Sequence, residues 1–361
     1  MALCEVANII GGGTPDTSNP LYWNGDIDWF TPTEVGESKY VNESKRKITY
    51  AGFKGSSAKL LPRGSILLST RASVGLASIT TNPQEVTTNQ GFQSVVPKRV
   101  EDSEFLYYVI SNQNTQRELK KKANGSTFPE ISNSEVSSII VSLPPDPKER
   151  FEISRFLATI DQRIQLQNKI INEVSSLINP LFDAYHKNLE AERFSLCDLA
   201  VIKKGEQVNA DVMSEENEIP MLNGGTSPSG FFTKSNRGSD TITISEGGNS
   251  CGYISFMTVP FWAGGHCYTV HPINRQRIHN RYLYFLLKRQ ETRIMALRVG
   301  SGLPNIQKKD LESFSLSVPS LDQQERIAQK LNIVASKLSL EQNLLDSLRH
   351  LKQFLLKNMF I

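Results

Sequence analysis

The chain repeats itself, and this repeat constrains its fold more than any other feature of the sequence. Three blocks of the first half recur in the second half in the same order: LCEVANI at 3–9 as LCDLAVI at 196–202, FLYYVI at 105–110 as YLYFLL at 282–287, and GSTFPEI at 125–131 as GSGLPNI at 300–306. A strand-like run that ends in proline follows each time, at Pro144 and at Pro319. Because blocks in matched order seldom arise by chance, the sequence predicts two copies of one scaffold. A duplication without functional meaning is the alternative.

A long helical stretch follows each proline, and its apolar residues step by four and by three. The residues expected to pair the helices are Ile153, Leu157, Ile160, Ile164, Ile171 and Val174 in the first stretch, and Leu331, Val334, Leu338, Leu345 and Leu348 in the second. A sustained 3.5-residue period is typical of supercoiled helix pairs. We expect an antiparallel coiled coil with one domain at each end. The alternative is that each helix packs on its own domain as ordinary amphipathic core. Pro180 should kink or end the first helix.

The expected fold class is α+β: two mixed α/β domains separated by the two long helices, with a pseudo-twofold internal repeat. Short β-branched runs alternate with Gly/Ser/Thr/Asn loops, and one helix per domain is expected, at 103–122 and at 278–298. The expected bounds are 1–147 for the first domain, 148–190 for the first helical region, 191–320 for the second domain and 321–361 for the second helical region.

The distribution of charge points to nucleic acid more than its total does, since the net charge is only +3. Lys120, Lys121 and Lys122 end the helix expected in the first half, where a solvated cap that favours the helix dipole is the alternative. In the second half, basic residues crowd one segment with little acid between them: Arg275, Arg277, Arg281, Lys288, Arg289, Arg293, Arg298, Lys308 and Lys309. Asn280, Ser301 and Asn305 are interleaved with them. Such clusters favour phosphate contacts.

Motifs for catalysis are incomplete. Gly11–Gly13 with Thr14 lacks the Lys-Ser/Thr of a phosphate loop, and we interpret the glycines as a turn that passes close to another segment. Residues 179–182, NPLF, resemble the NPPF motif of amino-methyltransferases, but they lie within the heptad helix. We expect no catalytic site and no metal. The four cysteines are interpreted as small buried hydrophobes in a reducing compartment. No apolar run approaches membrane-spanning length, so a cytoplasmic protein is expected.

Several longer segments resemble the specificity subunits of Type I restriction–modification systems. They are VANIIGGGTPDTSNPLYWNGDIDWFTPTEV at 6–35, ILLSTRASVG at 66–75, TTNQGF at 87–92 and the run from 125 to 161 that contains GSTFPEI, VSLPP and ERFEISRFLATID. The second half departs from the pattern, because residues 246–249, EGGN, replace residues 70–73, TRAS. His266-Cys267 falls near the position of Gln90-Gly91. Arg71 therefore has no basic counterpart, and a base-reading role of this residue is not expected to be shared by the second half.

The resemblance implies a target recognition domain in each half, each reading one half-site of a bipartite, asymmetric sequence in double-stranded DNA. It implies that the helices fix the unread gap and that two methyltransferase subunits dock on the chain. Those subunits would carry S-adenosylmethionine and methylate adenine, so no cofactor is expected in this chain. Restriction or translocase subunits would join the full complex.

On these grounds we expect DNA contacts in both halves. The candidate residues are Thr14, Arg71, Ser73, Asn89, Gln90, Lys120, Lys121, Ser126, Lys203, Lys204, Arg237, Asn249, His266, Arg289, Arg293, Arg298, Ser301 and Asn305. Two other functions remain open. One is a bipartite DNA-binding transcription regulator. The other is a stand-alone adenine methyltransferase, against which the missing cofactor loop argues.

Overall fold

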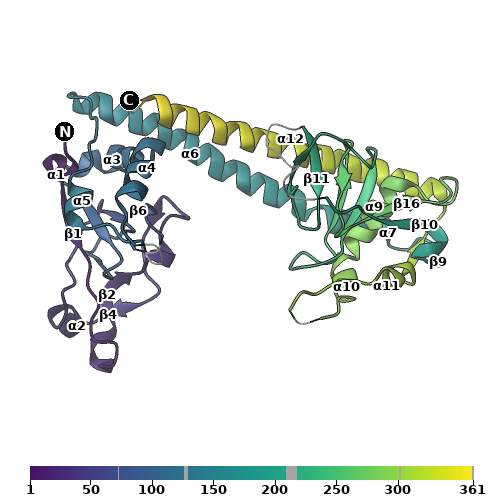
Figure 1. The fold of residues 1–361 in the computed structure, drawn as a ribbon, viewed down its shortest axis with the longest axis horizontal. Coiled ribbons are helices and arrows are strands. Elements are labelled where there is room, and N and C mark those ends of the chain that lie inside the picture. Colours follow the sequence, from purple (N-terminus) through teal and green to yellow (C-terminus); the bar gives the residue numbers. More distant parts are fainter. Residues whose placement is uncertain (72, 126–128, 209–217, 301, 360–361) are drawn as a thin grey trace. The chain divides into compact units, whose positions relative to one another are not determined.

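Two long helices, α6 (Pro147–Ser176) and α12 (Leu321–Met359), each contribute to both of the units into which the structure divides (Figure 1). Unit 1 comprises residues 1–168 and 343–361, and unit 2 comprises residues 169–342. The structure is a computed structural model that describes residues 1–71, 73–125, 129–208, 218–300 and 302–359. Within this part of the chain, no helix is both long and apolar enough to cross a membrane.

Unit 1 is built on a five-stranded sheet in the order β1-β8-β5-β6-β3, with a smaller sheet β4-β2-β7 beyond it. The strands are β1 (Ala7–Gly11), β2 (Trp23–Phe30), β3 (Tyr40–Val41), β4 (Lys47–Ile48), β5 (Ile66–Leu68), β6 (Ala77–Thr80), β7 (Thr87–Thr88) and β8 (Gln93–Pro97). The α-helices are α1 (Leu3–Val6), α2 (Tyr50–Lys54), α3 (Ser103–Ser111), α4 (Gln113–Lys122) and α5 (Asn133–Ser137), and the 3₁₀ turns are η1 (Pro20–Tyr22), η2 (Pro32–Glu34) and η3 (Val100–Asp102).

Unit 2 has a four-stranded sheet in the order β10-β16-β13-β14, a three-stranded sheet β12-β11-β15 and a pair β17-β9. The strands are β9 (Glu192–Ser195), β10 (Ala200–Lys204), β11 (Ile219–Leu222), β12 (Gly230–Phe232), β13 (Thr241–Ser245), β14 (Ile254–Met257), β15 (Trp262–Ala263), β16 (Cys267–Pro272) and β17 (Ser315–Val318). The helices are α7 (Ile178–His186), α8 (Leu196–Leu199), α9 (Asn280–Arg289), α10 (Glu291–Met295) and α11 (Lys308–Glu312).

The predicted repeat is confirmed in the strand pairing. Ala7 lies opposite Pro97 in the antiparallel β1–β8 ladder, and Ala200 lies opposite Pro272 in the antiparallel β10–β16 ladder. The smaller sheets repeat as well, because β2 pairs with β4 antiparallel and with β7 parallel, while β11 pairs with β12 antiparallel and with β15 parallel. The two globular parts are therefore two copies of one mixed α/β scaffold.

An apolar helix face covers the main sheet in each unit. In unit 1, Phe105 and Leu106 of α3 are fully buried in one cluster with Ile66 and Val95 of the sheet. Full burial of each such side chain contributes about 1.5–3 kcal/mol. In unit 2, residues from α9 fill the corresponding cluster with residues from β13 and β16. The repeated FLYYVI and YLYFLL blocks are thus the core faces of equivalent helices.

The expectation of one unbroken helix per domain was wrong. The stretch 103–122 divides into α3 and α4 because Asn112 adopts an extended conformation and its side chain accepts a hydrogen bond from the backbone N–H of Thr115 at 2.9 Å. This N-cap begins a new helix inside the predicted one. The stretch 278–298 similarly divides at Gln290, between α9 and α10.

The long helices run antiparallel within each unit. In unit 1, Ile153 and Leu157 of α6 share a cluster with Leu355 and Met359 of α12. In unit 2, the helix that contacts α12 in these interactions is α7, which follows α6: Lys330 of α12 lies over the ring of Tyr185 at 4.2 Å, and Leu181 packs in the same cluster as Leu331. The predicted pairing residues are buried or half-buried: Ile153, Leu157, Ile160, Ile164, Ile171, Val174, Leu331, Val334, Leu338, Leu345 and Leu348.

Lys352 interrupts the apolar stripe of α12, and it forms an ion pair there. In unit 1, the ammonium of Lys352 lies 2.5 Å from Oδ1 of Asp161, and the hydroxyl of Tyr108 donates to Oδ2 of the same carboxylate at 2.7 Å. The buried Lys39 donates to the Tyr108 hydroxyl at 2.8 Å. This network joins the globular part of unit 1 to both long helices.

Pro180 breaks the first helix as predicted, since α6 ends at Ser176 and α7 begins at Ile178. Proline has no N–H to bond the carbonyl of residue 176. The prediction that the cysteines are buried holds for Cys251 and Cys267 but was wrong for Cys4 and Cys197, which are exposed. Both exposed residues lie in the short helices α1 and α8, whose neighbouring leucines take the buried positions.

Candidate DNA-recognition sites

Three loops meet at one end of the strands of the main sheet in unit 1, and we call this end of the sheet the loop edge. The Thr70 N–H donates to the Gly91 carbonyl at 2.8 Å, and the Ile131 N–H donates to the Thr70 carbonyl at 3.0 Å. These bonds hold the loop after β5 between the loop before β8 and the segment before α5. A further pair of backbone hydrogen bonds, at 2.8 and 2.9 Å, closes Asn124 against Glu130.

The corresponding loops of unit 2 are joined by the same bonds. The Glu246 N–H donates to the His266 carbonyl at 2.9 Å, and the Ile306 N–H donates to the Glu246 carbonyl at 2.9 Å. Val299 and Asn305 close their loop with two backbone bonds of 2.8 and 3.0 Å. The predicted replacement of residues 70–73 by residues 246–249 is therefore confirmed in the backbone. His266 takes the structural position of Gly91, because its carbonyl accepts the equivalent hydrogen bond.

The side chains on this shared backbone differ between the units. In unit 1, the Arg71 guanidinium contacts the Glu130 carboxylate through Nη2 at 2.6 Å and through Nε at 3.0 Å. Both side chains are about half exposed, at 45% and 46%. Exposed ion pairs contribute about 0–1 kcal/mol, so a ligand can separate this pair at little cost. In unit 2, Gly247 and Asn305 occupy the matching bridge.

The glycines at 11–13 pass close to another segment, as predicted, and in the structure this segment is the loop before β8. A Cβ on Gly12 would lie 1.9 Å from the Asn89 carbonyl oxygen, which no side chain can accommodate. The side chain of Thr14 is hydrogen bonded to that of Gln90, and both groups are solvent-accessible. The close backbone approach thus places two predicted polar residues side by side.

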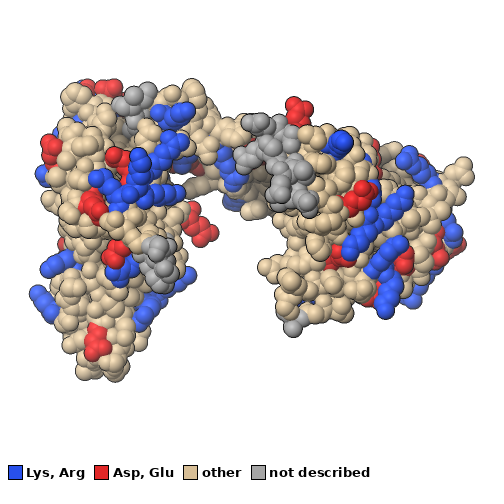
Figure 2. Space-filling view, in the orientation of Figure 1, with Lys and Arg blue, Asp and Glu red and all other residues tan. Residues whose placement is uncertain are grey.

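Basic side chains lie at the same edge. Helix α4 ends at Lys122 and leads directly into the loop that pairs with Arg71, so the exposed Lys120 and Lys121 stand at the entrance to that loop. Figure 2 shows Lys and Arg side chains gathered over the α3–α4 region of this unit. Ser73 is exposed on the central loop. Ser126 lies outside the described residues.

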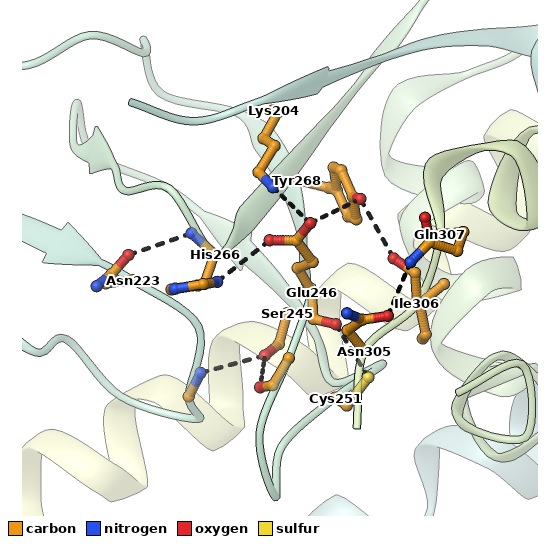
Figure 3. A network of polar contacts seen from close by, with 12 residues as sticks. Lys204, Asn223, Ser245, Glu246, Cys251, His266, Tyr268, Asn305, Ile306 and Gln307 are labelled. Carbon is orange, nitrogen blue, oxygen red and sulfur yellow. Dashed lines mark hydrogen bonds and ion pairs between the residues drawn. The ribbon is translucent and has the colours of Figure 1, made fainter. Parts of the chain in front are cut away.

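At the corresponding loop edge of unit 2, three side chains contact the carboxylate of Glu246 (Figure 3). The Lys204 ammonium and the Tyr268 hydroxyl donate to Oε1 of Glu246 at 2.6 and 3.0 Å, and Nδ1 of His266 lies 3.3 Å from Oε2. Burial opposes ionisation of Glu246. The hydrogen bonds from Lys204 and Tyr268 outweigh it and hold the pKa of the carboxyl below its usual value.

An open pocket of about 540 Å³ lies over this network, lined by Lys204, His266 and Asn305 among others. Oδ1 of Asn305 accepts a hydrogen bond from Gln307 at 2.9 Å. Asn249 is exposed on the adjoining turn. The pocket therefore brings together three of the residues predicted from the sequence. Ser301 lies outside the described residues.

The other predicted residues of unit 2 divide into two groups. Arg237 is largely buried and donates to the carbonyls of Asn236 and Lys204, so it supports the scaffold. Arg289 is held by Asp183, with its Nε 2.7 Å from Oδ1. The exposed side chains are Lys203, Arg293 and Arg298.

The sequence matches the model of the family described as "Type I restriction modification DNA specificity domain", over residues 1–176 and again over 188–350. These two matches cover nearly the whole chain. The chain belongs to this family. The description names DNA specificity, which is a recognition role.

Relatives named as specificity subunits are similar to this chain over different shares of its length. The MjaIX specificity subunit of Methanocaldococcus jannaschii is 36% identical over 176 residues, which are 47% of this chain and 40% of that protein. The match thus spans less than half of that relative. The EcoprrI specificity subunit of Escherichia coli is 25% identical over 91% of this chain and 85% of its own length. The S subunit crystal structure from M. genitalium superposes with a TM-score of 0.64 at 18% identity, covering 100% of this chain and 95% of that one, and shows the same fold.

Sequence reasoning about this chain missed the carboxylates. Glu130 pairs with Arg71, and Glu246 holds Lys204, yet neither was among the candidates. The repeat contained the signal for Glu130, because GSTFPEI and GSGLPNI align it with Asn305. The partners of Glu246 could not be found this way, since Lys204, His266 and Tyr268 come from separate strands and loops.

Proposed function

We propose that this chain is the non-catalytic DNA-recognition subunit of a Type I restriction–modification complex, and that it recognises a bipartite, asymmetric target in double-stranded DNA. The observation that carries the proposal is the matched loop backbone with unmatched side chains. Arg71 and Glu130 in unit 1 correspond to Gly247 and Asn305 in unit 2. Two equivalent frames that present different polar groups would read two different half-sites.

The chemistry of these groups suits base edges in the major groove. Arginine donates to guanine O6 and N7, glutamate accepts from cytosine N4, and asparagine pairs with adenine. The Arg71–Glu130 pair therefore favours a G·C pair in the first half-site, and Asn305 favours an A·T pair in the second. Lys120 and Lys121 at the first edge, with Arg293 and Arg298 in the second unit, would contact phosphates. Such contacts position a protein on DNA without reading sequence.

The long helices would serve as spacer and docking surface for two methyltransferase subunits, which would bring S-adenosylmethionine. Beside its buried face, the part of α12 in unit 1 exposes Leu344 (39%), Leu351 (44%) and Phe354 (63%). These residues follow one another at steps of seven and three, so they form an apolar stripe typical of a helix that packs against another helix. Restriction subunits would join the assembled complex in the cytoplasm.

Reconstitution tests this assignment. The purified chain alone should transfer no methyl group from labelled S-adenosylmethionine to DNA, and adding the methyltransferase subunit of the same system should give sequence-specific adenine methylation. Methyl transfer by the chain alone would refute the non-catalytic role. Sequence-specific DNA binding by a chain that forms no complex with the methyltransferase would instead identify a free-standing DNA-binding regulator.

Single substitutions then test the two reading edges. Arg71→Ala should relax one position of one half-site and leave the other half-site unchanged, since each good bidentate contact contributes about 1–3 kcal/mol of discrimination. Lys120→Ala should weaken binding to all sequences alike and reduce its salt dependence. A variant at Arg71 that still discriminates every position equally would remove this residue from base reading.

A further inference from the structure

A second pocket in unit 2 lies away from the loop edge, at the start of α9. It has a volume of about 570 Å³ and is lined by residues of α9, by the strand-end residue Phe256 and by Asn332 and Ser336 of α12. Its charged groups are Arg281, Arg275 and Asp240, and burial lowers the pKa of the fourth titratable group, His279. Cationic side chains therefore predominate. A pocket of this composition suits an anionic group.

Arg281 is the side chain at the centre of the pocket. Its Nε donates to Oδ1 of Asn332 at 2.5 Å, and its guanidinium carbon lies 4.0 Å from the centre of the Phe256 ring. Burial lowers its pKa. Among the described residues, no carboxylate oxygen comes within 4.0 Å of this guanidinium, and its two terminal nitrogens have no acceptor. Asp240 lines the pocket without forming such a pair. A half-buried guanidinium therefore keeps two donor nitrogens available.

The repeat supplies an internal comparison. Glu104 precedes FLYYVI as Arg281 precedes YLYFLL, so the two residues occupy equivalent positions at the start of α3 and of α9. In unit 1 the Glu104 charge is compensated within the chain, by the ammonium of Lys39 and by the Tyr40 hydroxyl at 2.6 Å. In unit 2 the sign is reversed. Asp240 interacts with Arg281 only at longer range, and the described residues form no direct ion pair like that of Glu104 with Lys39.

The surroundings of the pocket distinguish a protein ligand from DNA. Asn332, Ser336 and Leu340 follow one another four residues apart along α12, so they form one row on the helix surface. Leu340 is 66% exposed, and Ile333 beside the row is 73% exposed. A phosphate backbone gains nothing from these apolar side chains, whereas an amphipathic helix would cover them. An acidic residue on such a helix would reach Arg281 from the adjoining row.

We propose that the Arg281 pocket receives an aspartate or glutamate carboxylate from a helix of the docked methyltransferase subunit. The inference rests on the proposed function and assigns the docking contact in unit 2. The carboxylate would accept hydrogen bonds from the two terminal nitrogens of Arg281, while Ile333 and Leu340 pack against the apolar face of the same helix. Charge-assisted hydrogen bonds are about twice as strong as neutral ones, so this contact would help to fix the position of the partner helix.

The test measures binding of the methyltransferase subunit of the same system to the full chain by titration calorimetry, at low and at high salt. Arg281→Gln should weaken binding about 10- to 100-fold at low salt, which corresponds to about 1.4–2.8 kcal/mol. Asn332→Asp places a carboxylate beside Arg281 from within the chain. It should also weaken binding while leaving the melting temperature unchanged or raised. Lys308→Gln removes one positive charge from the same unit outside the pocket and is the matched control.

Each outcome decides a different statement. Loss of binding in both pocket variants, with Lys308→Gln unaffected and the fold intact by circular dichroism, supports the proposal. Wild-type binding by Arg281→Gln overturns it while the proposed function stands. If Arg281→Gln weakens DNA binding by the chain alone and not methyltransferase binding, the pocket takes phosphate and the proposal is wrong. If the wild-type chain binds no methyltransferase, both the proposed function and the proposal for the Arg281 pocket are wrong.

Discussion

A buried ion pair fixes the start of α6 on the globular part of unit 1, and removing one of its partners should destabilise this unit strongly. The Arg150 guanidinium contacts both oxygens of Asp102, at 2.8 and 3.2 Å, and its Nη1 donates to the Pro144 carbonyl at 2.7 Å. The Arg150 and Asp102 side chains are only 9% and 11% exposed. This arginine therefore compensates a buried carboxylate and also bonds a carbonyl of the segment that leads into α6.

Arg150→Gln should cost up to about 3–5 kcal/mol, because the buried Asp102 carboxylate then keeps only the exposed Arg99 as an ion-pair partner among the described residues, at 3.9 Å. In unit 2, an uncharged residue occupies the position equivalent to Arg150. Gln324, at the equivalent position of α12, accepts from the His279 N–H at 2.9 Å and donates to the Arg277 and Pro319 carbonyls. The double variant Asp102→Asn with Arg150→Gln should therefore recover a large part of the loss.

Urea unfolding followed by tryptophan fluorescence measures the effect. In a Trp262→Phe background, the remaining tryptophans, Trp23 and Trp29, both lie in unit 1 and report its unfolding. Arg155→Gln is the control, since Arg155 lies on the same helix and is 69% exposed. The reasoning is refuted if Arg150→Gln destabilises no more than the control, or if the double variant is no more stable than Arg150→Gln alone.

Three further variants have expected outcomes. Gly12→Ala should cost at least about 1–3 kcal/mol and weaken DNA binding, because the new Cβ would meet a backbone oxygen at 1.9 Å; equal effects in binding and unfolding assays for Gly238→Ala, which meets nothing within 4 Å, would contradict this. Replacing Arg293 and Arg298 with alanine should flatten the salt dependence of DNA affinity by up to about two counterions and preserve sequence preference; an unchanged slope would exclude phosphate contact. Glu246→Gln should lose about 1–2 kcal/mol at pH 7. Because the folded pKa of Glu246 lies below its ordinary 4.5, this stability is complete above pH 4.5 and is lost as the pH falls through the folded value, so the stabilities of wild type and variant in urea unfolding should converge as the solution is acidified.

The large-scale organisation could be predicted from the sequence because it depends on periodic and repeated patterns. The heptad steps identified the two long helices, and the repeated blocks identified two equivalent scaffolds. Local hydrogen bonds defeated the prediction where one residue decides the outcome. Asn112 ends one helix and caps the next with its side chain, and nothing in the apolar pattern of 103–122 marks that break.

The sites were harder to predict because their residues meet only after folding. The turn at Gly12 and the basic end of α4 could be identified from composition and spacing. The partners of a charged residue could not be identified in this way. Asp161, for example, accepts from Lys352 and Tyr108, which are far from it in the sequence. Arg281 illustrates the same limit. It was counted among the clustered cations, whereas its place in the fold separates it from the proposed phosphate contacts.

The central claim is that two equivalent frames with different side chains read two different half-sites. The most direct measurement maps N6-methyladenine across the genome of a host that carries this chain and its methyltransferase subunit. The account predicts one split, non-palindromic motif, with Arg71→Ala relaxing a position in one half and Asn305→Ala relaxing a position in the other. A palindromic motif, or two variants that alter the same half, would contradict it.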